Sequence, residues 1–464
     1  MVLNHTKIFN YKMNTINKQI ISQLTPILIL FLAIYSVIPY IKTGVPMASL
    51  LDNTFLWWGI SAFIIIVFFM SRYYFFDKRN SDNMMLVWIY LLWNLMCIVR
   101  GMFVAEIYWD WKGLIGNSMA LLMPIIIFSA TNKMVVQSLL TTYIKFALPL
   151  FLLVGTIIRT DAYGFYLIPT SFLLFFLPVL TNRQKTLLLI AAVIVLGADL
   201  GARSNVIKFG IPFFILLIYV FRNKIPVKMI ESLRITLIIL PFLFLGLGVS
   251  GVFNIFKMNE YIKGEYTSMG VDGEGNIVEQ DIIVDTRTFL YVEVLESAIN
   301  NNYWLLGRTP ARGNDSNTFG VIAAELTGRN ERLENEIGLA NVFTWTGLVG
   351  VVLYFLIFYR ASFLAINKSR NIYVKMLGVY VAFRWLYSWV EDINNFTLNY
   401  FMLMIMLGLC YSYSFRNMTD NEVTIWTRGI FDVRYIRIQK ILLKKENNEN
   451  RKYSGLTDLS QQEK

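Results

Sequence analysis

Apolar residues in this chain gather into long runs that short polar segments separate. Each run holds about 17 to 22 residues, which is enough for a helix to cross a bilayer. We expect spans near residues 24–41, 54–71, 83–103, 114–130, 138–158, 163–180, 186–202, 205–221, 235–252, 339–359, 376–390 and 395–415. The pattern therefore predicts an all-α, polytopic membrane protein with about twelve transmembrane helices.

One long polar segment, residues 251–338, interrupts this pattern after the ninth run. Polar segments of this length late in a membrane protein rarely serve only as connectors. The chain divides into an N-terminal transmembrane bundle (residues 1–252), a large loop (253–338), C-terminal transmembrane helices (339–415) and a basic tail (416–464). The large loop holds most of the arginines and carboxylates outside the expected cytoplasmic edges, so we expect the functional residues there.

Basic residues fall on alternate connections between the apolar runs. Clusters precede the first run and follow the second, sixth, eighth and tenth runs. Because such clusters remain in the cytoplasm, both termini are expected there and the large loop is expected on the outer face. The formal net charge of +11 then reflects topology and contact with anionic lipid, without nucleic-acid binding. Residues 251–338 instead hold 14 Asp or Glu against 7 Lys or Arg, a local net charge of −7.

Composition excludes several kinds of chemistry. Hydrophobic residues make up 56% of the chain, as a membrane protein requires. The single histidine, His5, precedes the first run, so the large loop has neither a His-ligated zinc site nor a histidine base. Cys97 and Cys410 lie within apolar runs, which argues against a disulfide framework. We expect no metal and no cofactor. The apolar positions of the tail predict an amphipathic helix at the membrane surface.

The large loop has its own internal pattern. Residues 253–285 are rich in glycine and acids and predict an irregular or hairpin insertion. Asp285 or Thr286 can cap a following helix, which places Arg287 in its first turn, where the helix dipole favours an anion. A tight turn around residues 303–313 and a second amphipathic segment near 317–328 come next.

Four short motifs carry a resemblance to a known family. They are Gly201-Ala202-Arg203-Ser204, Arg287, Leu305-Leu306-Gly307 and Gly347-Leu348-Val349-Gly350. Their order and spacing resemble the O-antigen polymerase/ligase superfamily, over residues 190–360. Asn335-Glu336 stands where the family carries His-Asn, and this departure favours a repeat-unit polymerase over a ligase.

The resemblance implies a metal-independent glycosyltransferase of the bacterial inner membrane. Its substrate would be an undecaprenyl-pyrophosphate-linked oligosaccharide, and its partners would be membrane lipids and a chain-length regulator. Arginine suits the leaving pyrophosphate because its guanidinium group binds phosphate oxygens in a bidentate manner. We expect catalytic roles for Arg203, Arg287 and the possible base Glu336. Substrate-binding roles are expected for Tyr291, Trp304, Arg308, Arg312, Asn335 and Arg384.

Each of these residues also has a structural interpretation. Arg287 could pair with Asp285 or Glu293, Arg203 with Asp199, and Arg384 with Glu391. The glutamates of residues 331–336 could form a solvated charge run. The competing functions are a transporter or flippase of lipid-linked oligosaccharide, and an O-antigen ligase. Transporters of this size usually show two similar halves, whereas this chain has one large loop and no visible half-repeat.

Overall fold

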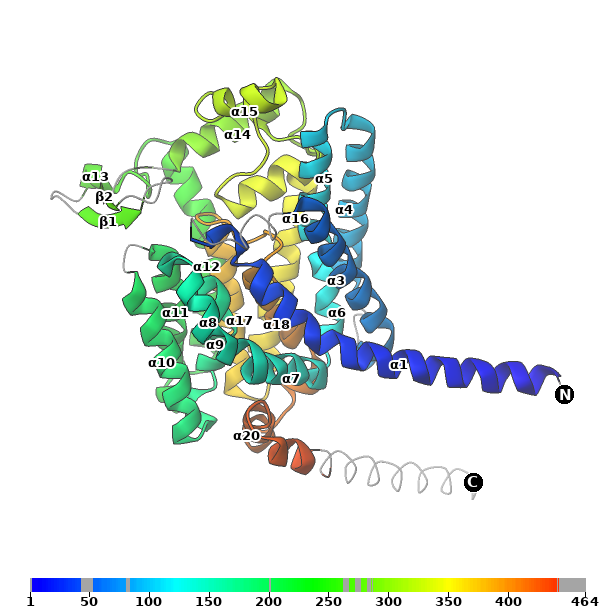
Figure 1. Ribbon diagram of the computed structural model, residues 1–464. Coiled ribbons are helices and arrows are strands. Elements are labelled where there is room, and N and C mark those ends of the chain that lie inside the picture. The colour runs from blue at the N-terminus through cyan, green and yellow to red at the C-terminus, as the bar shows by residue number, and fades with distance from the viewer. Residues whose placement is uncertain are drawn as a thin grey trace, which may run out of the picture.

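The computed structural model describes residues 2–42, 53–80, 84–199, 202–261, 267–271, 277–281, 285, 287–439 and 441. The protein is 76% helical and nearly all-α, which confirms the predicted class in this coarse form. Figure 1 shows long helices side by side, with α14 and α15 at one end of the bundle and α20 at the other. We call the end that carries residues 250–337 the loop face.

Eight helices in the described residues are long and apolar enough to cross a membrane. Three of them are composite: a 3₁₀ turn extends the first helix, and a 3₁₀ or π-helical turn joins two shorter α-helices in each of the other two. The elements that form the eight are α1 (Val2–Tyr35) with η1 (Ile38–Tyr40), α3 (Thr54–Phe75), α4 (Met85–Val104), α5 (Tyr108–Leu122) with η2 (Met123–Ile125) and α6 (Ile126–Ala130), α7 (Lys133–Thr142) with η3 (Tyr143–Ala147) and α8 (Leu148–Ile157), α11 (Arg203–Val220), α12 (Val227–Val249) and α16 (Gly338–Asn367).

The other four expected spans are shorter helices. They are α9 (Tyr163–Leu174), α10 (Asn182–Ala198), α17 (Ile372–Tyr387) and α18 (Leu398–Tyr411), and η4 (Thr160–Ala162) and η5 (Leu177–Val179) flank α9. Every residue of α18 is buried, and most of α17 is buried too. A helix that is apolar on all sides belongs in a core. In Figure 1 both lie in the middle of the bundle. The number twelve therefore stays a prediction, while eight spans have the required length.

Close helix contacts build this centre. A Cβ atom on Gly408 of α18 would lie 2.3 Å from the Cβ atom of Ala130 in α6, so only glycine allows the two helices to approach so closely. Trp385 of α17 is fully buried, and its Nε1 donates a hydrogen bond to the Ile238 carbonyl at 3.3 Å. The indole thus satisfies its polar atom inside an apolar core.

The loop face carries short elements. They are α13 (Met258–Tyr261), β1 (Thr267–Val271), β2 (Ile277–Asp281), α14 (Thr288–Asn300), β3 (Asn314–Asp315), α15 (Gly320–Thr327) and β4 (Glu331–Arg332). Of these, α13 and the β1–β2 pair project to one side of the bundle in Figure 1. Antiparallel pairing of β1 with β2 confirms a hairpin in the predicted insertion. The N-cap residue of α14 is Arg287, one position before the first turn in which we expected it. Asp285, one of the two predicted caps, still binds the start of the helix, since its Oδ1 accepts hydrogen bonds from the Arg287 and Thr288 amides at 3.0 and 2.9 Å. Thr286, the alternative cap, lies outside the described residues.

A kink in α16 receives the turn of residues 304–307. Gly347 adopts φ +68° and ψ −172° inside the helix, a conformation that favours glycine. The Leu348 amide donates to the Trp304 carbonyl at 2.9 Å, and the Arg308 amide donates to the Thr344 carbonyl at 2.7 Å. Two of the motifs that carry the family resemblance are therefore in direct contact.

The tail begins with α19 (Tyr413–Arg416) and α20 (Asp420–Gly429), followed by helical residues 433–439. Trp426 of α20 is fully buried and donates to the Lys133 carbonyl at 2.8 Å, while Gln137 donates back to the Trp426 carbonyl at 2.6 Å. Trp426 thus packs against α7 of the bundle, whereas Val433, Ile438 and Ile441 stay exposed, so an amphipathic helix at the membrane surface stays a prediction for that part of the tail.

Candidate functional site

Three segments converge on the loop face. They are the start of α14, residues 332–337 before α16, and the α17–α18 connection (residues 388–397). The Gly338 and Leu339 amides donate to carbonyls of this connection at 3.1 and 2.9 Å. The Tyr291 hydroxyl of α14 donates to the Trp389 carbonyl at 2.5 Å. We call the ionisable group gathered here the charged junction: Arg287, Arg332, Glu334, Glu336, Glu391 and Asp392.

Arg287 and Glu336, two of the residues predicted to be catalytic, form an ion pair in the charged junction. Arg287 Nε also donates to the Val390 carbonyl at 3.3 Å, which fixes the guanidinium group over the α17–α18 connection. Asp285, a partner suggested by the sequence, caps the helix backbone instead. Hydrogen bonds from Thr288 and Arg287 lower the pKa of Asp285, although burial opposes this shift. The interaction that joins the two predicted residues spans 49 positions of the sequence.

Glu336 contacts a second guanidinium group, since Arg332 Nη2 lies 3.3 Å from its Oε1. Each of its carboxylate oxygens therefore faces an arginine. A sugar hydroxyl would have to compete with both arginines to reach this carboxylate. The geometry thus suits Glu336 for holding Arg287 and Arg332 in place, and suits it less as a general base.

Arg308 and Arg312 both bind Glu331, a carboxylate that is 8% exposed. Arg308 Nη2 lies 3.0 Å and Arg312 Nε 2.8 Å from its oxygens, and Arg308 Nη1 donates to Asp315 Oδ1 at 2.8 Å. The network connects the turn of residues 303–313 with β3 and β4. The protein itself thus uses most of the donors that we predicted for substrate phosphates.

Asn335 lies inside the fold, 3% exposed, rather than at a surface that a substrate could reach directly. Its Nδ2 donates to Asn314 Oδ1 at 2.8 Å, and its backbone exchanges two hydrogen bonds with the Asn341 side chain at 2.6 and 2.8 Å. Trp304, by contrast, is 49% exposed at the tip of its turn. Of the two, only Trp304 presents a free surface to a sugar ring.

The two arginines predicted from the apolar runs differ in their surroundings. Arg203 is the first residue of α11 and its side chain is exposed, while the nearby Asp199 accepts a bond from the Ala202 amide at 3.2 Å. Arg384 is 1% exposed, and its Nη1 donates to Asn399 Oδ1 at 3.1 Å. Within the described residues, Arg384 forms no ion pair with Glu391 within 4.0 Å, and its Nε and Nη2 make no hydrogen bond.

Sequence reasoning missed Asp392 and Lys208 and treated Glu334 only as part of a charge run. Asp392 follows the last turn of α17, and Asn395 donates to its Oδ2. Burial and repulsion from Glu334 raise the pKa of Asp392 well above its usual range. Burial also raises the pKa of Glu334, against the opposing effect of Arg332. A lysine inside an apolar run is a functional candidate by default, so Lys208 could have been found from the sequence.

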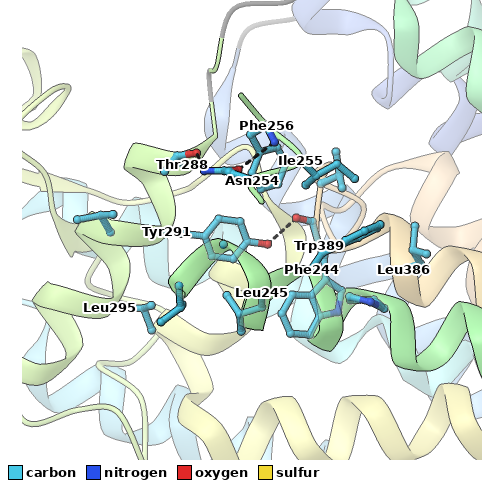
Figure 2. Close-up of a pocket in the computed structure, with 15 residues that line it drawn as sticks. Phe244, Leu245, Asn254, Ile255, Phe256, Thr288, Tyr291, Leu295, Leu386 and Trp389 are labelled. Carbon is cyan, nitrogen blue, oxygen red and sulfur yellow. Dashed lines mark hydrogen bonds between the residues drawn. The ribbon is translucent and has the colours of Figure 1, made fainter. Parts of the chain in front are cut away.

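An apolar cavity of about 210 Å³ lies beside the charged junction, between the end of α12, α14 and the end of α17. Figure 2 shows the Tyr291 ring in its middle, with the hydroxyl directed to the Trp389 carbonyl. Asn254 and Thr288 form a polar edge, joined by a 2.9 Å hydrogen bond, and Arg287 precedes Thr288 in the chain. Further lining residues, namely Leu245, Val249, Val292 and Leu295, retain large exposed surfaces, so the cavity is open on one side.

Among the described residues, no group of three or more His, Cys, Asp or Glu side chains could hold a metal ion. No protein-family model matches the chain, and no curated protein matches it significantly.

Proposed function

We propose that this chain is a membrane glycosyltransferase that polymerises undecaprenyl-pyrophosphate-linked oligosaccharide repeat units into O-antigen, capsular polysaccharide or exopolysaccharide. One observation carries the proposal: the Arg287 guanidinium group lies beside an open apolar cavity, since its Nε donates at 3.3 Å to the carbonyl of Val390, a residue of the cavity lining. A lipid pyrophosphate has the same two parts, an isoprenoid chain and an adjacent anion. The apolar cavity suits the chain, and Arg287 suits the pyrophosphate.

The chemistry requires few protein groups. A hydroxyl of one lipid-linked unit attacks the anomeric carbon of the growing chain, and the bond from that carbon to the pyrophosphate oxygen breaks. Positive charge beside the departing pyrophosphate stabilises the transition state most where water is scarce. Arg287 and Arg332 provide two guanidinium groups around Glu336, and a pyrophosphate could replace that carboxylate as their partner.

Contact between the Leu305-Leu306-Gly307 turn and the Gly347 kink supports the same proposal, because both motifs resemble the polymerase/ligase superfamily. In this proposal the loop face lies on the outer side of a bacterial inner membrane and both termini lie in the cytoplasm. The alternating basic connections favour this orientation. A chain-length regulator remains the expected protein partner.

A flippase of lipid-linked oligosaccharide is the second candidate. The buried charged residues Lys208 and Arg384 favour it, since transporters place such groups along substrate pathways. A ligase would use the same chemistry with another acceptor.

The test is a deletion strain of the source organism, complemented with wild type, Arg287→Ala or Arg434→Ala, with surface glycan resolved by size. Arg434 is a matched control because its side chain is 85% exposed and lies in the tail. We expect deletion and Arg287→Ala to leave single repeat units in place of the long-chain ladder, at normal protein levels, while Arg434→Ala keeps the ladder. Loss of all surface glycan, with lipid-linked units retained on the cytoplasmic face, would instead identify a flippase.

A further inference from the structure

Two cations lie buried near the charged junction, and at least part of the hydrogen-bonding capacity of each is unused among the described residues. Lys208 of α11 and Arg384 of α17 are each 1% exposed. Within the described residues, Lys208 Nζ makes no hydrogen bond and lies 4.3 Å from the centre of the Phe165 ring. Arg384 uses one nitrogen for Asn399 and leaves Nε and Nη2 without a partner. Buried charge of this kind is costly unless other charges compensate it or a function requires it.

The compensating carboxylates lie in the α17–α18 connection. The Lys208 ammonium interacts electrostatically with Glu391 and Asp392. Arg384 lies one helical turn before this connection, since the Ser388 amide donates to its carbonyl at 3.1 Å. Lys208 therefore adds positive potential at Asp392, although burial and repulsion from Glu334 have the larger and opposite effect on the pKa of Asp392.

Amide groups hold Asp392 in a defined orientation. The Asn395 side chain donates to Asp392 Oδ2. The Asn394 side-chain amide, in the orientation that satisfies both neighbours, donates to Asp392 Oδ1 at 2.9 Å and to the Gly338 carbonyl at 3.3 Å. Glu334 lies four residues before Gly338, whose amide donates to the Glu391 carbonyl at 3.1 Å and whose carbonyl Asn394 joins to Asp392. The Glu334 carboxyl group also interacts electrostatically with Asp392. Glu334 keeps an exposed surface, although surrounding protein atoms are close enough to desolvate its carboxyl group. Glu334 is thus the member of the pair that a substrate can reach.

We propose that Glu334 and Asp392 act as one proton-accepting pair for the acceptor hydroxyl, with Glu334 receiving the proton. This inference rests on the proposed function. In the step, the hydroxyl oxygen forms a bond to the anomeric carbon while the bond from that carbon to pyrophosphate breaks. The electron pair leaves with the pyrophosphate, and the hydroxyl proton moves to Glu334, from which solvent removes it. No metal or redox partner is needed for this balance.

The pair has the electrostatic properties that such a role requires. Two adjacent carboxylates resist full ionisation, so they titrate in two steps that belong to the pair. Burial raises the pKa of both carboxyl groups, and repulsion from Glu334 adds to the shift of Asp392, which makes the ionised pair a stronger base. The other charged and titratable groups that face the pair are Tyr35 of α1, Tyr40 of η1, Lys208 of α11, Arg332, Tyr354 of α16, Glu391 of the α17–α18 connection and Tyr400 of α18, while Arg384 of α17 faces Lys208.

An infrared titration tests the shared proton independently of catalysis. Purified protein in lipid nanodiscs is titrated while the carboxylic-acid C=O stretching band is followed. We expect a band that persists after the exposed carboxylates have ionised and that both Glu334→Gln and Asp392→Asn remove or shift. The exposed Glu296 of α14 is the matched control, and Glu296→Gln should leave the band unchanged. If wild type shows no such band, or if the band is unchanged in both variants, Glu334 and Asp392 do not share a proton.

Activity then tests the role of the proton. Lipid-linked repeat units extracted from the source strain are supplied to protein reconstituted in vesicles. Glu334→Gln and Asp392→Asn should lower kcat on the order of 10²- to 10⁴-fold with little change in KM, and Glu334→Asp should recover part of the rate. If wild type forms polymer and both variants match it, the base assignment fails alone. If wild type forms no polymer, the proposed function fails, whatever the infrared result.

Discussion

Glu331→Ala is expected to be among the most destabilising single substitutions on the loop face. Glu331 is 8% exposed and accepts hydrogen bonds from Arg308 Nη2 at 3.0 Å and from Arg312 Nε at 2.8 Å. Arg312 Nη2 makes a further bond to the same carboxylate. Without this carboxylate, two guanidinium groups whose side chains are only 15% and 18% exposed would face each other.

The magnitude follows from this geometry. Each hydrogen bond to a charged group contributes about 1.5–3 kcal/mol, but bonds that share one carboxylate are not additive. Removal of one member of a buried ion pair costs about 3–5 kcal/mol. Arg308 keeps Asp315 as a second partner at 2.8 Å, and both arginines retain some contact with solvent. We therefore expect the lower end of that range, about 3 kcal/mol in the free energy of unfolding.

The assay is equilibrium unfolding of the purified protein in mixed micelles, followed by tryptophan fluorescence. Glu296→Ala is the matched control, because Glu296 is an exposed glutamate on the neighbouring helix, and we expect it to change stability by less than about 0.5 kcal/mol. A cost for Glu331→Ala below about 1 kcal/mol, the value of an exposed ion pair, would refute the reasoning. In that case Arg308 and Arg312 would be available to a substrate after all.

Two further predictions concern backbone geometry and pH. Gly347→Ala should displace the turn of residues 304–307 and cost more than about 2 kcal/mol in thermal unfolding, because its φ is +68° and its Cβ would lie 2.3 Å from the Leu305 carbonyl oxygen. Gly59→Ala is its control, since no atom lies within 4 Å of that Cβ, and it should not destabilise. Asp285→Asn should weaken the cap of α14 at neutral pH. The folded-state pKa of Asp285 is lowered, so its contribution is present above its ordinary value of 3.8 and is lost as the pH falls through the folded value. The difference between wild type and Asp285→Asn, measured by hydrogen exchange of α14, should therefore disappear in acid; a difference that persists there would contradict this explanation.

Much of the architecture was accessible from local sequence patterns. Eight of the twelve apolar runs correspond to helices of spanning length, because hydropathy over about twenty residues reports directly on the medium that a helix can occupy. Asp285 was one of two candidate caps, which the sequence could offer because capping depends on neighbours two or three residues away. Hydropathy predicted apolar helices at α17 and α18 but could not show that they lie in the centre of the bundle. That position depends on packing against helices distant in the chain.

The candidate site was predictable in its residue types but not in its pairings. Arg287 and Glu336 were singled out separately, yet their ion pair joins two segments of the large loop that lie 49 positions apart in the sequence. Arg308 and Arg312 were expected to face substrate, whereas a buried carboxylate 19 positions beyond Arg312 binds both. Charged side chains on a polar loop carry no local sign of their partners, because several carboxylates lie within reach of each in the unfolded chain.

By itself, the sequence determined that this protein is a helical membrane protein with one large polar loop, since apolar run length and charge placement act through solvation alone. Only the tertiary structure decided which charged side chains become buried, which of them form ion pairs and which a substrate can reach. Glu334, Asp392, Lys208 and Arg384 come from four separate segments and acquire their shared electrostatics through packing. Because burial lowers the dielectric and brings distant charges together, the chemistry of such a site is a property of the fold and not of any local motif.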